Sequence, residues 1–425
     1  MSSLQEIVKS KDIKLIIKNY FFLVVTQFGN YLIPFLLTPF IIRKIGAAQF
    51  GEISYFQNVV IYTTLFINFG FEYTATRLVA RNQKNNKKLA SVFFNTLLAK
   101  VFLLLISLGF TFVWFLSSNK LQNNMPLLLA CWIINLGFVL YPGWFFQGME
   151  QMKLTSLFNL AIKIAGAVAS LLFLHPDNYL LIPVSFSVSQ IAIGFIAFVV
   201  ATQQYKFASA FKSFKFSFTG VLQNLRESLP MFITQLTNST YLLGTFLIVA
   251  VFVSSEELGY FSGIQKFIYA LLMLVQLPLN NALFPYVNRV SESNPAKGKT
   301  IVKKLMLGGI ALGVLLAVFV YMFAPIIVDL FLNTKDGRVV LQMQTFSWLA
   351  AIMPLSGIVS YQGLYANYLD RYSYAISIVC ALVACTFTFF TGNSLGVLSA
   401  IWGWIIAQWL DTCLTFVVLR RETFL

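Results

Sequence analysis

Long runs of apolar residues alternate with short polar and basic segments along the whole chain. A helix that crosses a membrane needs about 20 mostly apolar residues, because each residue adds about 1.5 Å toward a hydrocarbon core of about 30 Å. The pattern therefore predicts twelve transmembrane helices. We expect them at about residues 19–42, 51–76, 90–116, 126–146, 154–174, 179–201, 228–253, 259–286, 304–332, 340–364, 372–390 and 396–418.

The composition supports an all-α integral membrane protein. Of the 425 residues, 58% are hydrophobic and 11% are charged, whereas soluble domains average about 45–50% apolar and about 25% charged residues. The net charge of +15 would suit a nucleic-acid-binding protein. The lysines and arginines, however, lie almost entirely in short tracts between apolar runs, which is how membrane topology distributes them. We expect the lipid bilayer as the chain's surroundings and no nucleic-acid partner.

The placement of the basic residues predicts the orientation of the chain. If the N-terminus is cytoplasmic, the inner segments carry 22 of the 30 Lys and Arg residues and the outer loops carry 5. Cytoplasmic loops of membrane proteins carry the excess of Lys and Arg. Both termini are therefore predicted to lie in the cytoplasm.

The longest connection between predicted helices, residues 202–227, is basic and aromatic. It predicts three parts of the chain: a six-helix lobe at 1–201, a cytoplasmic linker at 202–227 and a second six-helix lobe at 228–425. The two halves also match each other. An offset of 208 residues places Gly51 and Ser54 on Gly259 and Ser262, and later matches follow at offsets of 215 and 218, such as Gln147 on Gln362 and Gln190 on Gln408.

Six is an even number of spans, so both halves enter the membrane in the same direction. The repeat is therefore expected to be parallel, with a pseudo-two-fold axis along the membrane normal. One interpretation is a transporter whose two lobes rock around a central cavity for alternating access. The other is a duplication whose symmetry no longer serves the mechanism.

The second predicted helix carries the most specific pattern in the chain. The segment Gly46–Gly51 (GAAQFG) opens it, and Asn68–Phe71 (NFGF) followed by Thr74–Arg77 (TATR) closes it. This pattern resembles the polysaccharide-transport branch of the multidrug/oligosaccharidyl-lipid/polysaccharide exporter superfamily, and within it the O-antigen-type flippases. A glycine at the start would let this helix begin in close contact with a neighbouring helix. A glycine at the other end would permit close approach of another helix or a helix cap.

The resemblance implies two six-helix bundles around a V-shaped cavity that opens alternately to each side. It also implies a bacterial inner-membrane flippase that moves an undecaprenyl-diphosphate-linked oligosaccharide, such as an O-antigen unit, from the cytoplasmic to the periplasmic face. Contact with surface-glycan polymerase machinery is a further expectation. Related branches often carry charged residues in their first helix, where this chain offers only Asn19, Gln27 and Asn30.

Charged residues inside the predicted spans are the main candidates for a site. An ionised group at mid-membrane costs at least about 2.5–3.5 kcal/mol on insertion scales, so it usually serves a function. Lys100, Lys163 and Lys266 could bind the diphosphate of a lipid-linked substrate. Their long side chains could instead carry the ammonium group to the interface.

Acidic and amide residues complete the candidate set. Asp411 and Glu72 could bind a coupling H⁺ or Na⁺, or form ion pairs with basic residues. Polar residues at equivalent positions of the repeat could bind sugar hydroxyls or join helices to one another. These polar candidates are Gln27, Asn30, Gln235 and Asn238.

Two other functions fit the sequence less well. A multidrug cation antiporter of the same fold is the alternative, but cationic drugs favour carboxylates over three intramembrane lysines. A membrane enzyme would need a cluster of His, Asp or Glu or an extramembrane catalytic segment, and the outer loops are too short to hold one. We predict that the chain is not an enzyme and has no cofactor and no metal site; its four cysteines lie in apolar runs without CxxC spacing.

Overall fold

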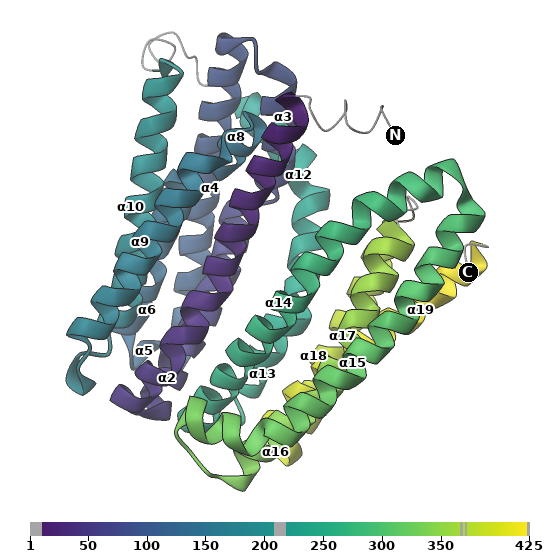
Figure 1. The fold of residues 1–425 in the computed structure, drawn as a ribbon. Coiled ribbons are helices and arrows are strands. Elements are labelled where there is room, and N and C mark those ends of the chain that lie inside the picture. The colour runs from purple at the N-terminus through teal and green to yellow at the C-terminus, as the bar shows by residue number, and fades with distance from the viewer. Residues whose placement is uncertain (1–10, 208–217, 366–368, 370–371, 423–425) are drawn as a thin grey trace. The chain divides into compact units, whose positions relative to one another are not determined.

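The computed structural model describes residues 11–207, 218–365, 369 and 372–422, and the regular elements in this part of the chain are helices (Figure 1). In order they are α2 (Lys11–Asn68), α3 (Phe71–Asn82), α4 (Asn86–Ser117), α5 (Asn119–Gln122), α6 (Met125–Trp132), α7 (Ile134–Leu140), α8 (Gly143–Gly148), α9 (Met152–Phe173), the 3₁₀ turn η1 (Pro176–Asn178), α10 (Leu181–Gln204), α12 (Phe218–Ser239), the π-helical η2 (Thr240–Gly244), α13 (Thr245–Val249), α14 (Ser255–Ser293), α15 (Pro295–Leu332), α16 (Gly337–Thr345), α17 (Ser347–Gly357), the π-helical η3 (Ile358–Leu364), α18 (Ser373–Leu395) and α19 (Val397–Arg421).

These helices accommodate all twelve predicted spans. Among the described residues, ten helical stretches are long and apolar enough to cross a membrane. The first of them, Gly29–Asn82, covers two predicted spans, because two helices meet at Gly46, whose φ of 82° and ψ of 163° interrupt the helix. The remaining predicted span, 228–253, is built from α12, η2 and α13. The twelve-helix all-α membrane fold is confirmed.

The predicted span at 126–146 is not one regular helix. It consists of α6, α7 and α8, with an extended residue at Tyr141 and a break at Pro142. Proline has no backbone N–H to donate to the carbonyl four residues earlier. That carbonyl belongs to Phe138, and it accepts a hydrogen bond from the Lys100 side chain instead.

The described residues form two compact units. The first contains residues up to Ile33 together with Phe56–Gln235, and the second contains Pro34–Tyr55 together with Leu236 onward. The segment Pro34–Tyr55, where the two helices within α2 meet, therefore packs with the second unit. The predicted lobe boundaries at 201 and 228 stay a prediction, and residues 208–217 of the predicted linker lie outside the described part.

In the second unit, residues related by the 208-residue offset contact one another. A Cβ atom on Gly51 would lie 1.8 Å from the backbone oxygen of Ser255, and one on Gly259 would lie 2.0 Å from that of Ala47. Ala47 and Ser255 are themselves 208 residues apart, so the two contacts are reciprocal, as a two-fold axis requires. Ser262 Oγ donates to Ser54 Oγ at 2.8 Å in the same contact. Only glycine lets the two backbones approach this closely.

The core of the first unit is rich in aromatic side chains. Phe93 packs against Phe145, Phe207 and Trp144, with ring centroids 5.4, 5.1 and 5.8 Å away. Each of these four side chains is at most 3% exposed. Such ring pairs stabilise the fold beyond the area they bury, and they fix α4, α8 and the segment that follows α10 against one another.

Helix α16 of the second unit begins at a charged cap. Asp336 Oδ1 accepts the backbone N–H of Arg338 at 2.8 Å, and its other carboxylate oxygen accepts the Arg338 guanidinium at 3.0 Å. These hydrogen bonds hold the pKa of the Asp336 carboxyl below its ordinary value. The acidic cap suits the positive end of the helix dipole.

Candidate functional site

Lys100 lies in the middle of α4 in the first unit and is 3% exposed. Its Nζ donates to Asn68 Oδ1 at 3.2 Å and to the carbonyl oxygen of Phe138 at 3.0 Å. The Phe138 carbonyl is the one that Pro142 leaves without a helical N–H partner. The ammonium group thus replaces a missing backbone donor at the break between α7 and α8, and it does not extend to the interface.

Lys163 and Asn30, two of the predicted site residues, meet in the first unit. Lys163 lies on α9 and is half-buried, and Asn30 lies exposed on α2. The Lys163 Nζ donates to Asn30 Oδ1 at 2.5 Å. A lysine ammonium has three donors, so this amide oxygen occupies one of them and also positions the charge.

Lys266 lies on α14 in the second unit. Its Nζ is 4.2 Å from the centroid of the Phe50 ring, and Phe50 is 2% exposed. A lysine ammonium at this distance over an aromatic face forms a cation–π interaction. The neighbouring Gln265 is buried at 8% exposure. The surroundings of Lys266 therefore differ from those of Lys100 and Lys163, which are held by oxygen acceptors.

The remaining predicted residues are placed less completely. The side chains of Gln27 and Asn238 lie outside the described part, and Gln235 is half-buried on α12. Glu72 is exposed in the first turn of α3, where a carboxylate is favoured by the helix dipole. The structure brings together Lys163 and Asn30, whereas Glu72 lies in the first unit and Asp411 in the second.

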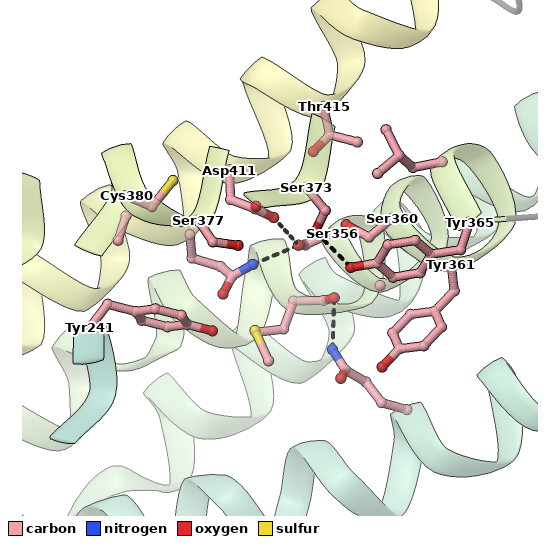
Figure 2. Close-up of a pocket in the computed structure, with 16 residues that line it drawn as sticks. Tyr241, Ser356, Ser360, Tyr361, Tyr365, Ser373, Ser377, Cys380, Asp411 and Thr415 are labelled. Atoms are coloured by element: carbon pink, nitrogen blue, oxygen red, sulfur yellow. Dashed lines mark hydrogen bonds between the residues drawn. The ribbon is translucent and has the colours of Figure 1, made fainter. Parts of the chain in front are cut away.

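Asp411 borders a polar cavity of about 220 Å³ inside the second unit. Figure 2 shows its lining, which comes from η2, α14, α17, η3, α18 and α19. Among the described residues that border it, none is Lys, Arg or His. The lining consists of Tyr241, Gln276, Met353, Ser356, Gly357, Ser360, Tyr361, Leu364, Tyr365, Ser373, Ser377, Cys380, Ala407, Gln408, Asp411 and Thr415.

Hydrogen bonds order one wall of this cavity. Gln408 Nε2 donates to Ser356 Oγ at 2.5 Å, and Ser356 Oγ donates to Asp411 Oδ2 at 3.4 Å (Figure 2). Tyr365 and Ser373 share a hydrogen bond of 2.9 Å between their hydroxyl groups. Asp411 is thus held by a serine hydroxyl, whereas the sequence left open an ion pair with a lysine.

Sequence reasoning missed the tyrosines and serines of this cavity. Tyr241, Ser356 and Tyr361 are isolated polar residues within apolar runs, and no motif marks them. Two of them lie on π-helical segments, which are rare and occur mostly at functional sites. A π-helical turn has no sequence signature that separates it from an ordinary membrane helix, so only the structure could find them.

Comparison with known proteins settles the family. The family described as polysaccharide biosynthesis protein matches residues 16–291. The chain belongs to this family. It is also 24% identical over 358 residues, or 84% of its length, to a provisionally assigned O-antigen transporter of Escherichia coli K12, and covers 85% of that protein. A protein of Shigella dysenteriae with the same provisional assignment is 21% identical over 88% of the chain and is covered to 92%.

Solved structures confirm the fold of this family member. The lipid II flippase MurJ in an inward closed conformation matches with a TM-score of 0.70 at 13% identity, covering 94% of the chain and 87% of MurJ. An inward-facing multidrug transporter of the MATE family matches with a TM-score of 0.69 at 13% identity, covering 94% of both chains. The resemblance to polysaccharide transporters of the exporter superfamily is confirmed, and these relatives are transporters and not enzymes.

Proposed function

We propose that the chain is a flippase for an undecaprenyl-diphosphate-linked oligosaccharide, an O-antigen unit or a similar surface-glycan repeat. The observation that carries this proposal is the similarity to the Escherichia coli K12 relative along 84% of the chain. The fold shared with a lipid II flippase supports it, because lipid II is also a lipid-linked substrate. The shared fold alone would suit a multidrug antiporter equally, since a MATE transporter matches with a similar TM-score.

The intramembrane cations favour the anionic lipid over a cationic drug. Lys163 is half-buried in the first unit, and its ammonium group donates a hydrogen bond to Asn30. Two of its three donors can still face a phosphate oxygen. Lys100 is committed to Asn68 and Phe138, so we assign it a structural contribution beside its predicted binding role. Lys163 is therefore the leading candidate for the diphosphate, and Lys266 is the candidate in the second unit.

The mechanism we propose is alternating access in the bacterial inner membrane, with both termini in the cytoplasm. Substrate would bind from the cytoplasmic side, and the two lobes would rock to release it at the periplasmic side. A ligand shifts such an equilibrium only by its differential affinity for the two states. An H⁺ or Na⁺ gradient acting at Asp411 or Glu72 would bias the return step, and surface-glycan polymerase machinery would receive the product.

A leaflet-accessibility assay tests this function. The purified protein is placed in vesicles that contain undecaprenyl-diphosphate-linked N-acetylglucosamine, and a soluble galactosyltransferase with labelled UDP-galactose is added outside. Without flipping, only the outer leaflet reacts and labelling stops near half of the lipid. With the protein, labelling should approach completion. A plateau that stays near half, together with ion-driven efflux of a cationic dye, would replace the flippase by the antiporter.

The same assay tests Lys163. Replacing it with Ala should slow flipping by at least about tenfold, because a hydrogen bond to a charged group contributes about 1.5–3 kcal/mol. Lys153→Ala is the matched control, since Lys153 is exposed ten residues earlier on the same helix. Equal rates for both variants would remove Lys163 from the site.

A further inference from the structure

The polar cavity of the second unit has a counterpart in the first unit that is almost closed. The offsets of 215 and 218 residues place Ser356 on Tyr141, Ser373 on Phe158, Asp411 on Ile193 and Thr415 on Ala197. All four first-unit residues border one small pocket of about 10 Å³, whereas the second-unit cavity measures about 220 Å³. The same place in the repeat is therefore nearly closed by mostly apolar side chains in the first unit, whereas in the second unit it is an open cavity with a polar lining.

Such a cavity is costly unless something occupies it. Buried polar groups inside a membrane need hydrogen-bond partners. A water molecule needs only about 10–15 Å³ by the same measure, so the cavity has room for a ligand of many atoms. A bound metal ion or proton would not need this volume.

The chemistry of the lining indicates what kind of ligand fits. Serine and tyrosine hydroxyls both donate and accept, the Gln408 amide does the same, and the Asp411 carboxylate accepts only. A sugar hydroxyl also donates and accepts, so it can satisfy each of these groups. The negative charge of Asp411 disfavours a diphosphate or a carboxylated sugar in this cavity, and the described part of the lining offers no Lys, Arg or His to offset that charge.

Aromatic rings supply the apolar part of such a site. Tyr361 and Tyr365 lie edge to face with ring centroids 5.4 Å apart, and Tyr361 is 44% exposed (Figure 2). Tyrosine presents an apolar face and a polar tip, which matches the C–H face and the hydroxyl rim of a pyranose. The π-helical segments η2 and η3 bring Tyr241 and Tyr361 to the cavity. The π-helical turns therefore determine which side chains line the cavity.

We propose that the cavity bordered by Asp411, Ser356 and Tyr361 is a glycan subsite that binds one neutral pyranose of the transported oligosaccharide. This inference rests on the proposed flippase function and deepens it. The diphosphate is held elsewhere, by lysines, so the subsite gives the transporter a preference for lipids that carry sugar over lipids that carry the diphosphate alone. The second unit would then determine which sugars the transporter accepts.

Binding measurements on the full chain in lipid nanodiscs test the subsite. Four probes are compared by native mass spectrometry: undecaprenyl diphosphate alone, and the same lipid carrying N-acetylglucosamine, glucose or galactose. Wild type should bind at least one sugar-bearing lipid about tenfold more tightly than the sugar-free lipid, the effect of one or two hydrogen bonds of about 0.5–1.5 kcal/mol each. Tyr361→Ala should bring this ratio close to one, and Tyr361→Phe should retain most of it.

Control variants distinguish loss of sugar binding from loss of folding. Binding of the sugar-free lipid reports that each variant is folded, and Ile193→Ala, at the equivalent position of the first unit, should leave the ratio unchanged. Asp411→Asn keeps a hydrogen-bonding oxygen and should retain part of the sugar preference. Equal binding of all four lipids by wild type would overturn the subsite and leave the flippase proposal standing, whereas binding of none would overturn both. A Na⁺- or pH-dependent ratio that Asp411→Asn abolishes would reassign the cavity to a coupling ion.

Discussion

Ser54 and Ser262 are hydrogen-bonded through their side chains at 2.8 Å, although they are 208 residues apart in the chain. Both are buried, at 1% and 4% exposure. The same offset relates the glycines and backbone oxygens that surround them. Equivalent residues of the two halves thus meet each other directly, as they do at a two-fold axis. This gives the internal repeat a structural meaning that the sequence matches alone could not provide.

This contact should open and close if the protein works by alternating access. In a background without the four native cysteines, we expect Ser54→Cys with Ser262→Cys to form a disulfide on oxidation. A disulfide requires Cβ atoms about 3.5–4.5 Å apart, which suits side chains already in contact. Cross-linking should stop flipping in the vesicle assay, and a reductant should restore it.

Two controls accompany the cross-link. Each single cysteine variant should flip the lipid at the wild-type rate with or without oxidant. Ser54→Cys with Ser293→Cys should not cross-link, because Ser293 lies 31 residues further along α14, about 46 Å away along the helix. Full activity of the cross-linked protein would show that this contact does not separate during transport.

The partnership between Lys100 and the Phe138 carbonyl predicts a coupling with Pro142. Lys100→Met should lower the stability of the protein by about 1–3 kcal/mol, because it leaves a buried acceptor without a donor. Pro142→Ala restores a backbone N–H four residues after Phe138. The double variant should therefore lose less stability than the sum of the two single variants, as measured by thermal unfolding in detergent.

The double variant would contradict this coupling if its loss of stability equalled the sum of the losses for Lys100→Met and Pro142→Ala. Strict additivity of the two substitutions would mean that the Lys100 ammonium does not compensate for Pro142. The flipping rate, measured on the same variants, separates the structural contribution from substrate binding. A stable double variant that still fails to flip the lipid would show that Lys100 also binds substrate, as predicted.

Gly70 should be sensitive to the smallest substitution. Its φ is 76°, in the left-handed region, and a Cβ atom would lie 2.8 Å from Cβ of Met231. Gly70→Ala should destabilise the protein by at least about 1–2 kcal/mol from backbone strain alone. Gly109→Ala is the matched control, since nothing lies within 4 Å of its Cβ position in a regular helix. It should leave the melting temperature unchanged or raise it slightly.

Several features of the fold could be predicted because they depend on residues that are close in sequence. The twelve spans follow from apolar runs, whose length is tied to membrane thickness. The need for glycine at Gly51 and Gly70 could be expected from their places at the ends of the second span. The break at Pro142 is equally local, yet the apolar run at 126–146 conceals it because hydropathy does not record a missing N–H.

The candidate site was predicted less completely. Lys163 and Asn30 were each singled out as polar residues inside spans, and the structure adds that they are partners. Lys100 was singled out on the same ground, but its acceptor is a carbonyl that becomes free only because of a proline elsewhere in the unit. The cavity around Asp411 was missed, since its tyrosines and serines are scattered between Tyr241 and Thr415.

The class of the protein, its number of spans and its internal repeat could be predicted without a structure, because the lengths of apolar runs, the placement of charges and the offsets between matching residues are all properties of the linear sequence. Which of those residues contact one another depends on the three-dimensional packing. Ser54 contacts Ser262, and Lys100 contacts Phe138. Asp411 borders an open cavity, whereas its counterpart in the repeat, Ile193, borders a pocket of the first unit that is almost closed. These outcomes depend on distances between segments far apart in the chain, which only packing sets.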